Sequence, residues 1–429
     1  MRYFRLVPLL FLLVLANPAA AQRQLLLEGI EVRPPEAREL VLRLLALQPG
    51  EGIEATTVAA AKLRLESSGS FDSVEVYSER GSATGTLRLI VDADLDRGLH
   101  LQTGLGHRPI SGWYFDLIGG RWNNPLRRGG HLEFSMRNGQ RQSGFYGNWR
   151  VPQLIFGADA RVELSAMEQQ WRMHFEKGVY DKPIRRNHLL LGLEWRPPSQ
   201  WATTLWLGST YVKPLSEIEA ITGKRDSEVE QLLPQNQNSR RLATFGLDFR
   251  LDEREPSRSW YEGYFSALQL RHYRDVEEAL AFWQVDAEAA VALPSFGGSA
   301  FALRGKFAGI SDEAPYYMRP TLGGTGSVRG FRDSSLSGLA GTKSTLVGSV
   351  EWRTPLVGSD PSSARIIGVL FADAGRVSNS PRDFDVGIGY GLRVRVPWIS
   401  VFSIDAGIPL SESLTDDPFW VHSSLSFGF

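Results

Sequence analysis

The chain has 429 residues, a formal net charge of −1, no cysteine, and 43 glycines, 12 tryptophans and 12 tyrosines. The near-neutral charge argues against a nucleic-acid partner, and the lack of cysteine excludes a disulfide framework, thiolate catalysis and cysteine-ligated zinc. The mean hydropathy of −0.19 is compatible with a transmembrane β-barrel, whose strands alternate in polarity and leave overall hydropathy unremarkable.

The N-terminus has the features of a secretory signal peptide. Two arginines are followed by an apolar run from Leu6 to Ala16 and by small residues that end at Ala21. The run is about 11 residues, short of the roughly 20 that a spanning helix needs, so we expect residues 1–21 to be removed as a signal peptide. No later apolar stretch reaches about 18 residues, which excludes an ordinary helical membrane protein.

Residues 22–97 predict a small α+β domain. A strand in QLLLEGIEV is followed by helices in PPEARELVLRLLAL and EATTVAAAKLRLESSG, then by paired strands in FDSVEVYSE and TGTLRLIVDADL. The stretches LQPGEGI, SGSFDSVEVY and LRLIVDADL resemble a POTRA domain, the periplasmic module that precedes outer-membrane assembly and secretion barrels. That resemblance implies binding of extended polypeptide at a sheet edge. The alternative is an unrelated small α+β domain.

Residues 98–429 predict a membrane barrel. Segments of about 10 residues alternate in polarity between turns, and about 330 residues at roughly 20 per strand and turn correspond to about 16 strands. In DVGIGYGLRVRV, for example, Val386, Ile388 and Tyr390 share one face while Asp385 shares the other with glycines. A soluble β-sandwich rarely continues this pattern so far without a domain break. The expected fold is therefore an all-β transmembrane barrel of about 16 antiparallel strands, with a small N-terminal periplasmic α+β (POTRA-like) domain.

The stretch GGTGSVRGFRD, residues 323–333, suggests a phosphate-binding loop at first sight. Its glycines at 324, 326 and 330 are spaced G-x-G-x-x-x-G, which matches neither the dinucleotide nor the P-loop pattern. No buried strand precedes it and no helical pattern follows it, as a phosphate site of that kind requires. We therefore expect no nucleotide site here.

The same stretch contains VRGF, and FADAG follows at residues 371–375. With a POTRA-like domain before a barrel, these motifs resemble the outer-membrane insertase and translocator superfamily (the bacterial surface antigen family), which includes the barrel-assembly (BAM) and two-partner-secretion transporters. The resemblance implies that VRGF lies at the tip of the sixth extracellular loop, folded into the lumen, and that F-x-D-x-G lies on the inner wall. It also implies a C-terminal aromatic assembly signal. The residues concerned are Val328, Arg329, Gly330 and Phe331, then Phe371, Asp373 and Gly375, and finally Phe427 and Phe429.

A guanidinium in a partly dry lumen needs a carboxylate within bidentate reach. Strand alternation turns Glu351 and Asp373 inward on neighbouring strands. We therefore expect Arg329 to bond to Asp373, with Glu351 close enough to share the charge. The alternative is a solvated arginine in a mobile loop.

The sequence contains no convincing catalytic site. Its seven histidines form no HExxH pair, and no G-x-S-x-G elbow occurs. We expect no enzymatic activity, no metal and no cofactor.

The family resemblance implies a barrel that receives unfolded chains through the POTRA-like domain and inserts them into the outer membrane or exports them. The implied partners are an unfolded polypeptide client, outer-membrane lipid, and periplasmic chaperones or components of the assembly machinery. Only about 75 residues precede the barrel, room for one POTRA-like domain where the family usually has two or more, so the client stays open. The alternative is a passive pore or structural barrel with an N-terminal plug or tether. A short, weakly paired junction between the first and last strands would favour the transporter.

Overall fold

The computed structural model describes residues 25–45, 47–108, 112–126, 129–155, 157–175, 178–196, 201–215, 219–222, 229, 231–233, 238–254, 260–358, 363–378, 384–396, 400–411 and 418–426. These form two compact units: an N-terminal unit that ends at Leu95, and a barrel unit that holds residues 68–70 and everything from Asp96 onward. The predicted signal peptide, residues 1–21, lies outside the described residues, as do Phe427 and Phe429.

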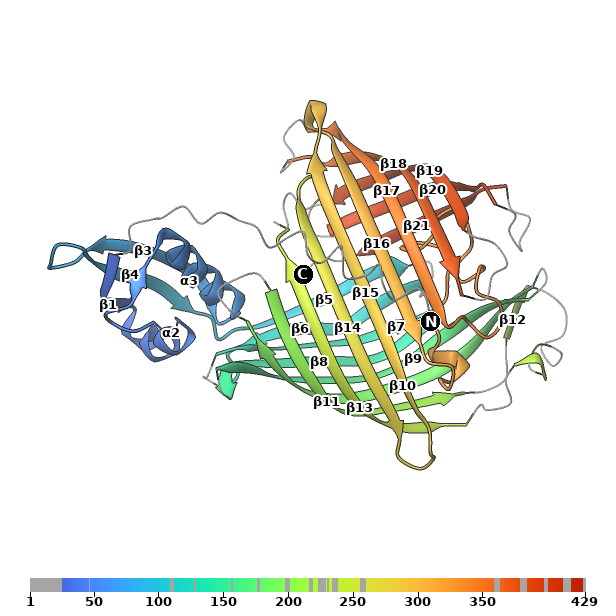
Figure 1. Ribbon diagram of the computed structural model, residues 1–429, viewed down its shortest axis with the longest axis horizontal. Helices are drawn as coiled ribbons and strands as arrows, with labels where there is room; N and C mark the ends of the chain where they lie inside the picture. Colours follow the sequence, from blue (N-terminus) through green and yellow to red (C-terminus); the bar gives the residue numbers. More distant parts are fainter. Residues whose placement is uncertain are drawn as a thin grey trace, which may run out of the picture. The chain divides into compact units, whose positions relative to one another are not determined.

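The N-terminal unit is a four-stranded sheet of order β2-β1-β4-β3 with two helices (Figure 1). Strands β1 and β4 are parallel, and the other neighbours are antiparallel. The elements are β1 (Leu25–Arg33), the 3-10 turn η2 (Pro35–Ala37), α2 (Arg38–Leu45), β2 (Gly52–Ile53), α3 (Ala55–Ser67), β3 (Phe71–Arg80) and β4 (Thr86–Leu95).

The core of this unit lies between the helices and the sheet. On α2, the residues Leu40, Val41 and Leu44 are buried at the i, i+1, i+4 spacing of one helical face, and they belong to the same cluster as Leu27 and Leu89 from the sheet. Strand β3 is at the edge of the sheet and has a free hydrogen-bonding side in the described structure. None of the described helices is long and apolar enough to cross a membrane.

The barrel unit is a closed antiparallel sheet, which confirms the predicted fold class (Figure 1). In the described structure, sixteen strands form the wall, and the short strand β12 (Glu219–Thr222) pairs with β10 in addition. The wall strands are β5 (Leu99–Arg108), β6 (Gly112–Asn123), β7 (His131–Gly139), β8 (Gln142–Ile155), β9 (Ala158–Phe175), β10 (Gly178–Trp195), β11 (Trp201–Pro214), β13 (Arg240–Asp252), β14 (Gly263–Asp275), β15 (Ala281–Pro294), β16 (Ala300–Ile310), β17 (Ser344–Val357), β18 (Ile366–Val377), β19 (Asp385–Val396), β20 (Ser400–Pro409) and β21 (Trp420–Ser426).

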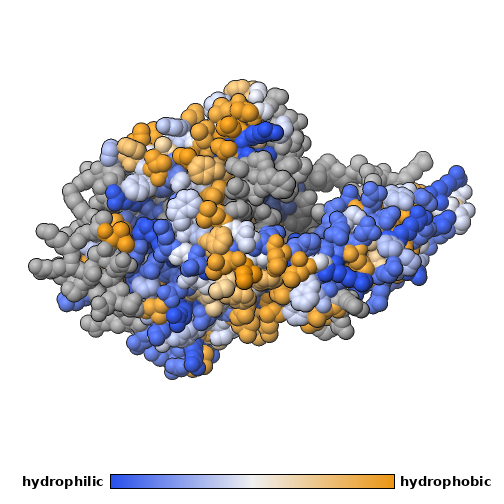
Figure 2. All heavy atoms as spheres, turned by 180° about the vertical axis from the view of Figure 1, so that it is seen from behind, coloured by the Kyte–Doolittle hydropathy of each residue, from blue (hydrophilic) through white to orange (hydrophobic). Residues whose placement is uncertain are grey.

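Alternation along the strands separates a lipid-facing surface from the lumen. On β13, for example, Phe245 is 49% exposed while its neighbours Thr244 and Gly246 are buried. Leu207 and Tyr390 likewise point outward and are 64% and 65% exposed. Figure 2 shows such hydrophobic side chains gathered across the barrel surface, bordered by hydrophilic ones. The residues that alternate with these outward ones face the lumen.

The two ends of the barrel differ. We call the end where β5 begins and β21 ends the base, and the opposite end the loop end. The loop end carries the longest connections, which are residues 215–239 between β11 and β13 and residues 311–343 between β16 and β17. The second of these we call the lumen loop. Its 3-10 turn η4 (Tyr316–Met318) is buried in an apolar cluster with residues of β9, β10 and β15.

We call the junction between the last and first strands the seam, and its described part is short. Among the described residues, β21 and β5 are aligned at the single Cα pair Leu425 and His107. His107 Nδ1 is also 3.1 Å from the carbonyl oxygen of Ser423. Residues 427–429 lie outside the described residues, so this alignment covers the last strand only as far as Ser426.

Candidate functional site

The lumen loop owes its sharp turns to glycine. Gly324, Gly326 and Gly330 have φ values of +91°, +77° and +97°, in the backbone region that residues with a Cβ rarely adopt. The amide of Gly324 donates to the carbonyl of Val328 at 3.1 Å, and the amide of Ser327 donates to the carbonyl of Gly324 at 3.1 Å. These bonds close a compact turn that presents Val328–Phe331, the tip of the loop, to the barrel wall.

Arg329 at the tip is bound by Asp373 on β18. Its Nε and Nη2 donate to the two carboxylate oxygens at 2.7 and 2.8 Å, and its backbone amide donates to Oδ2 at 3.0 Å. Ser349 of β17 accepts from Nη2 at 3.2 Å and donates to Asp373 at 2.6 Å. Arg329 and Asp373 are 6% and 1% exposed. This bidentate, buried geometry is the strong form of an arginine–carboxylate pair.

The remaining guanidinium nitrogen of Arg329 faces two further carboxylates. Nη1 lies 2.6 Å from Glu351 of β17 and 3.6 Å from Asp405 of β20. Each of these acids has an arginine of its own: Arg353 donates to Glu351 at 2.7 Å, and Arg393 donates to Asp405 at 2.8 Å. Three arginines and three carboxylates therefore balance in one lumenal cluster.

Aromatic and aliphatic side chains cover this cluster. The guanidinium carbon of Arg329 lies 3.7 Å from the ring centroid of Phe371, a cation–π geometry that gains strength where water is excluded. Val328 and Phe331 on either side of it are 0% and 1% exposed, and both pack with Leu322. The apolar shell strengthens the ion pairs by lowering the local dielectric.

Glycines on the wall make room for the tip. A Cβ at Gly387 of β19 would lie 1.9 Å from the carbonyl oxygen of Arg329, and one at Gly407 of β20 would lie 2.6 Å from the amide of Gly330. A Cβ at Gly375 of β18 would lie 2.4 Å from the side chain of Val328. We call these three the glycine slot. The slot lets the loop backbone lie directly on the sheet.

The structure brings most of the predicted site residues together. Val328, Arg329, Gly330 and Phe331 contact the wall beside Glu351, Phe371, Asp373 and Gly375. Sequence reasoning missed Ser349, Asp405, Arg393, Gly387 and Gly407. A signal for two of them was available, because ADAG at residues 372–375 has a near copy, IDAG, at residues 404–407.

A second set of contacts holds the lumen loop after its tip. His174 Nε2 of β9 is 2.8 Å from the carbonyl oxygen of Asp333, and the guanidinium of Arg332 lies 4.6 Å from the ring centroid of Trp420 on β21. Burial raises the pKa of the Asp333 carboxyl to about 6, although the charge of Arg172 opposes this shift. The loop therefore touches the last strand as well as the opposite wall.

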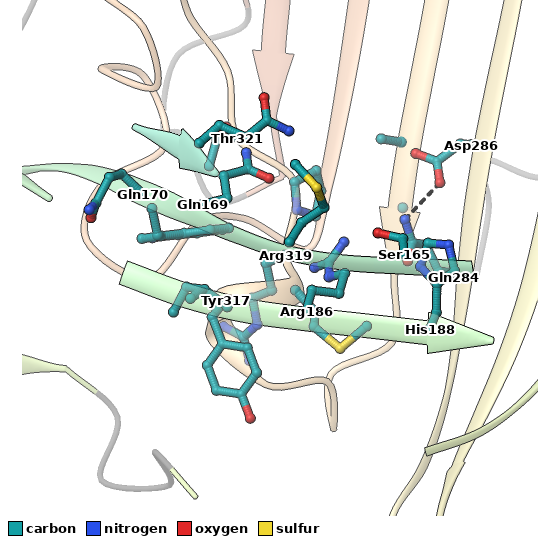
Figure 3. Close-up of a pocket in the computed structure, with 18 residues that line it drawn as sticks. Ser165, Gln169, Gln170, Arg186, His188, Gln284, Asp286, Tyr317, Arg319 and Thr321 are labelled. Carbon is teal, nitrogen blue, oxygen red and sulfur yellow. Dashed lines mark hydrogen bonds between the residues drawn. The ribbon is translucent and has the colours of Figure 1, made fainter. Parts of the chain in front are cut away.

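A polar cavity of about 420 Å³ lies between the lumen loop and the barrel wall. Figure 3 shows Gln169 and Gln170 with Arg186 and His188 among its lining side chains. On the far wall, Gln284 donates to Asp286 at 2.7 Å (Figure 3). The lumen thus keeps a polar space beside the folded loop.

The cluster around Arg329 is suited to anchoring. Each of its carboxylates is engaged by an arginine within 2.8 Å, so none is a free acid or base. The cluster can hold the loop tip against four strands at once, because its charges come from β17, β18, β19 and β20.

Comparisons with known proteins agree with this architecture. Residues 124–429 match the family model described as the Omp85 superfamily domain. The chain is similar to the solved structure of BamA from Haemophilus ducreyi lacking POTRA domains 1–3, with a TM-score of 0.65 and 18% identity over 94% of this chain and 85% of that one. It is also similar to CdiB from Escherichia coli, with a TM-score of 0.64 and 14% identity over 94% of this chain and 76% of that one.

CdiB from Acinetobacter baumannii gives a TM-score of 0.60 and 14% identity, over 94% of this chain and 74% of that one. No curated protein matches the chain. At these identities the structural likeness supports the fold, whereas the family match covers most of the chain and confirms the resemblance based on VRGF and FADAG. A β-barrel of this family lies in the outer membrane, and the chain belongs to the Omp85 superfamily.

Proposed function

We propose that the protein is a non-enzymatic outer-membrane barrel that receives unfolded polypeptide through its N-terminal unit and inserts it into the membrane or exports it. In this proposal the N-terminal unit is a POTRA-like domain in the periplasm, so the base of the barrel faces the periplasm and the loop end faces outward. Long loops on the outer side are usual for such barrels. The relatives named BamA and CdiB belong to the same architecture.

The observation that carries the proposal is the seam. Strands β9 and β10 are paired continuously from Phe175 and Gly178 to Asp159 and Glu194, whereas the described parts of β21 and β5 are aligned at one Cα pair. Parting two strands costs roughly 0.5–1.5 kcal/mol for each backbone hydrogen bond that is lost. Among the wall strands as far as the structure describes them, the seam is therefore the junction that we expect to open at least cost, and an open seam would expose strand edges to which a client strand could pair.

Engineered disulfides test this proposal cleanly, because the natural chain has no cysteine. His107→Cys with Leu425→Cys would close the seam, since these residues are Cα partners. Ser266→Cys with Ala289→Cys would bridge β14 and β15 as the matched control. We expect the closed seam to stop insertion or export in cells that have no other copy, and reduction to restore it. Mass spectrometry measures the amounts of outer-membrane and secreted proteins in each variant.

Full activity with a locked seam would contradict the proposal and favour the alternative, a passive pore or structural barrel. The polar cavity beside the lumen loop is the observation that favours this alternative. A passive pore would conduct ions equally with the seam locked or free, and its conductance would rise when the lumen loop is shortened. Planar-bilayer recordings of both disulfide variants separate the two functions.

We also propose that the client first binds the edge strand β3. The ten residues of β3 have one hydrogen-bonded neighbour, β4, in the described sheet, and Tyr77 on this strand is 38% exposed. A photo-crosslinking residue at Tyr77 should capture unfolded polypeptide, and one at the exposed Glu36 should capture much less. Equal capture at both positions would argue against an edge-binding mode.

We propose that the C-terminal aromatic residues Phe427 and Phe429 are the signal for barrel assembly. Deletion of Phe429 should lower the amount of barrel in the outer membrane while leaving the N-terminal unit folded, because an aromatic at the membrane interface would serve recognition of the nascent barrel. Quantitative immunoblotting of membrane fractions, compared with protease resistance of the N-terminal unit, measures both effects.

A further inference from the structure

Four cations lie near the loop end on the outward face of neighbouring strands. They are Arg185 on β10, Lys213 on β11, Arg241 on β13 and Arg274 on β14, all in exposed positions, and we call them the basic row. Alternation fixes their direction. Val212 and Leu242, which adjoin Lys213 and Arg241, are each 0% exposed and belong to the inner apolar cluster at the loop end, so the cations point away from the lumen.

The strand register places the four cations beside one another. Arg185 is directly opposite Lys213. Tyr211 is opposite Arg241, which makes Lys213 the diagonal neighbour of Arg241. Ala243 is opposite Arg274, which makes Arg241 the diagonal neighbour of Arg274. Directly opposed residues are about 5 Å apart and diagonal ones about 7–8 Å, so the basic row is continuous across four strands.

The row lies at the border of the lipid-facing surface that is nearer the loop end. Between the row and the base, outward residues such as Leu191, Leu207 and Phe245 are 55%, 64% and 49% exposed. On each of these strands, an aromatic side chain lies near the base on the same face as the cation. The four pairs are Trp195 with Arg185, Trp201 with Lys213, Phe249 with Arg241, and Tyr264 with Arg274. The separation is about 10 residues, which is the length of strand that crosses a bilayer core about 25 Å thick in such barrels.

Aromatic residues also mark the border at the loop end. Tyr211 is opposite Arg241, and the ring of His272 lies 4.6 Å from that of Trp283, which is 53% exposed. Amphipathic aromatic side chains gather where the apolar core meets the headgroups. The basic row lies level with or just beyond these residues, at the depth of the lipid headgroups.

Among the described residues, the charges of the row are largely unmatched. Arg185 bonds to Glu168 of β9 at 3.3 Å. Lys213, Arg241 and Arg274 make no side-chain hydrogen bond or ion pair within the part of the chain that the structure describes. The nearby turn after β14 carries Glu277 and Glu278, but Glu278 binds Arg240, which lies on the inner face. Within the described part of this surface, the row carries more positive than negative charge, which favours an anionic partner.

We propose that the basic row binds the phosphate groups of lipids in the outer leaflet. Lysine and arginine held at a membrane surface attract anionic headgroups, and the spacing of the row matches several phosphates on adjacent lipids better than one small ion. The proposal rests on the orientation given under Proposed function, with the loop end outward. A bound phosphorylated glycolipid would fix one side of the barrel in the outer leaflet, on the strands that are remote from the seam.

Native mass spectrometry of the full chain in detergent tests this directly, with bis-phosphorylated lipid A as the probe and its dephosphorylated form as the lipid control. The triple variant Lys213→Gln, Arg241→Gln, Arg274→Gln removes the unmatched charges. Arg376→Gln is the matched protein control, because Arg376 is also exposed and outward near the loop end but has Leu346 as its cross-strand partner.

We expect the natural chain to prefer the phosphorylated probe, the triple variant to bind it about 10- to 100-fold more weakly, and the Arg376 variant to bind as the natural chain does. Heat-modifiable gel mobility verifies that each variant is folded. Unchanged binding by the triple variant, or equal binding of both lipids by the natural chain, would overturn the proposal. A protein partner would then be the alternative ligand of the basic row. No client is present in this assay, so its result is independent of whether the barrel transports polypeptide.

Discussion

The wall β17–β20 and the seam β21–β5 are next to each other in the barrel but are stabilised in different ways. The wall has long backbone ladders and, in addition, the buried cluster of three arginines and three carboxylates that binds the tip of the lumen loop. The described seam has one aligned Cα pair. The comparison teaches that the loop is attached to strands with long backbone ladders, whereas the neighbouring junction has few paired residues in its described part.

The same comparison explains where a change should matter. A buried ion cluster depends on being complete, because each charge left without its partner keeps its desolvation cost. A short backbone junction loses little with any one side chain. Substitutions in the wall cluster should therefore have large, coupled effects, and substitutions beside the seam should have small ones.

Arg329→Ala should have the largest effect. It leaves Asp373 buried and unpaired, which costs about 3–5 kcal/mol, and we expect the lumen loop to lose its protection against hydrogen exchange by that amount. Asp373→Ala should do the same, and the double variant should cost little more than either single one. Arg329→Lys should restore only part of the protection, because an ammonium cannot make the planar bidentate contact.

Simple addition of the two alanine effects would show that Arg329 and Asp373 do not act as a pair. Arg185→Ala is the control for loss of an exposed arginine, since its side chain is 49% exposed. It should leave hydrogen exchange in the lumen loop unchanged.

Asp333 should make the lumen loop sensitive to pH. Burial raises its pKa to about 6, above the value of about 3.9 expected in an unfolded chain. A raised carboxyl pKa contributes stability that is fully present below about pH 4 and is lost as the pH rises through 6. Asp333→Asn should therefore protect the loop by about 2–3 kcal/mol at pH 7.5 and by little at pH 4.

Hydrogen exchange of residues 322–337 across this pH range measures the effect. Asp312→Asn is the control in the same loop, because the Asp312 side chain is 68% exposed and pairs with Lys343 at the surface. The same pH profile in the natural chain and in Asp333→Asn would show that burial of this carboxyl is not responsible.

Gly387→Ala should push the tip away from the glycine slot. The added Cβ would meet the carbonyl oxygen of Arg329, and overpacking of this kind costs about 1–3 kcal/mol. Gly348→Ala on β17 is the matched control, since its Cβ would meet nothing within 4 Å. Greater protease sensitivity of the lumen loop in the first variant alone is the expected result, and equal sensitivity would mean that the slot does not position the loop.

Trp420→Leu should have the smallest effect. It removes the cation–π contact of Arg332 with β21, worth about 0.5–1 kcal/mol. Trp420 is on the last strand, so loss of this contact should make the seam more mobile. Thiol–disulfide exchange in the His107→Cys, Leu425→Cys variant should then be faster, as measured by thiol labelling over time. A large loss of loop protection would instead place Trp420 in the main anchor and remove the contrast between wall and seam.

The pattern of the sequence was sufficient for the barrel and for the inner face of the site. Period-two alternation depends only on neighbouring residues, so it turned Glu351 and Asp373 inward before any partner strand was known. The arginine in VRGF required a buried carboxylate, and FADAG supplied one. The same local rule could not show that Asp405 and Arg393 meet Arg329, because the strands that bring them together are chosen by barrel closure.

What the sequence alone determined is therefore which residues face lipid and which face the lumen, since that follows from the spacing of apolar residues along each strand. The tertiary structure decided which lumenal charges meet. It brings β20 beside the loop tip, leaves no room for a Cβ at Gly387 and Gly407, and lines up Arg185, Lys213, Arg241 and Arg274 on four strands. These contacts join residues far apart in the chain, and their distances depend on strand register, tilt and closure, which no local pattern specifies.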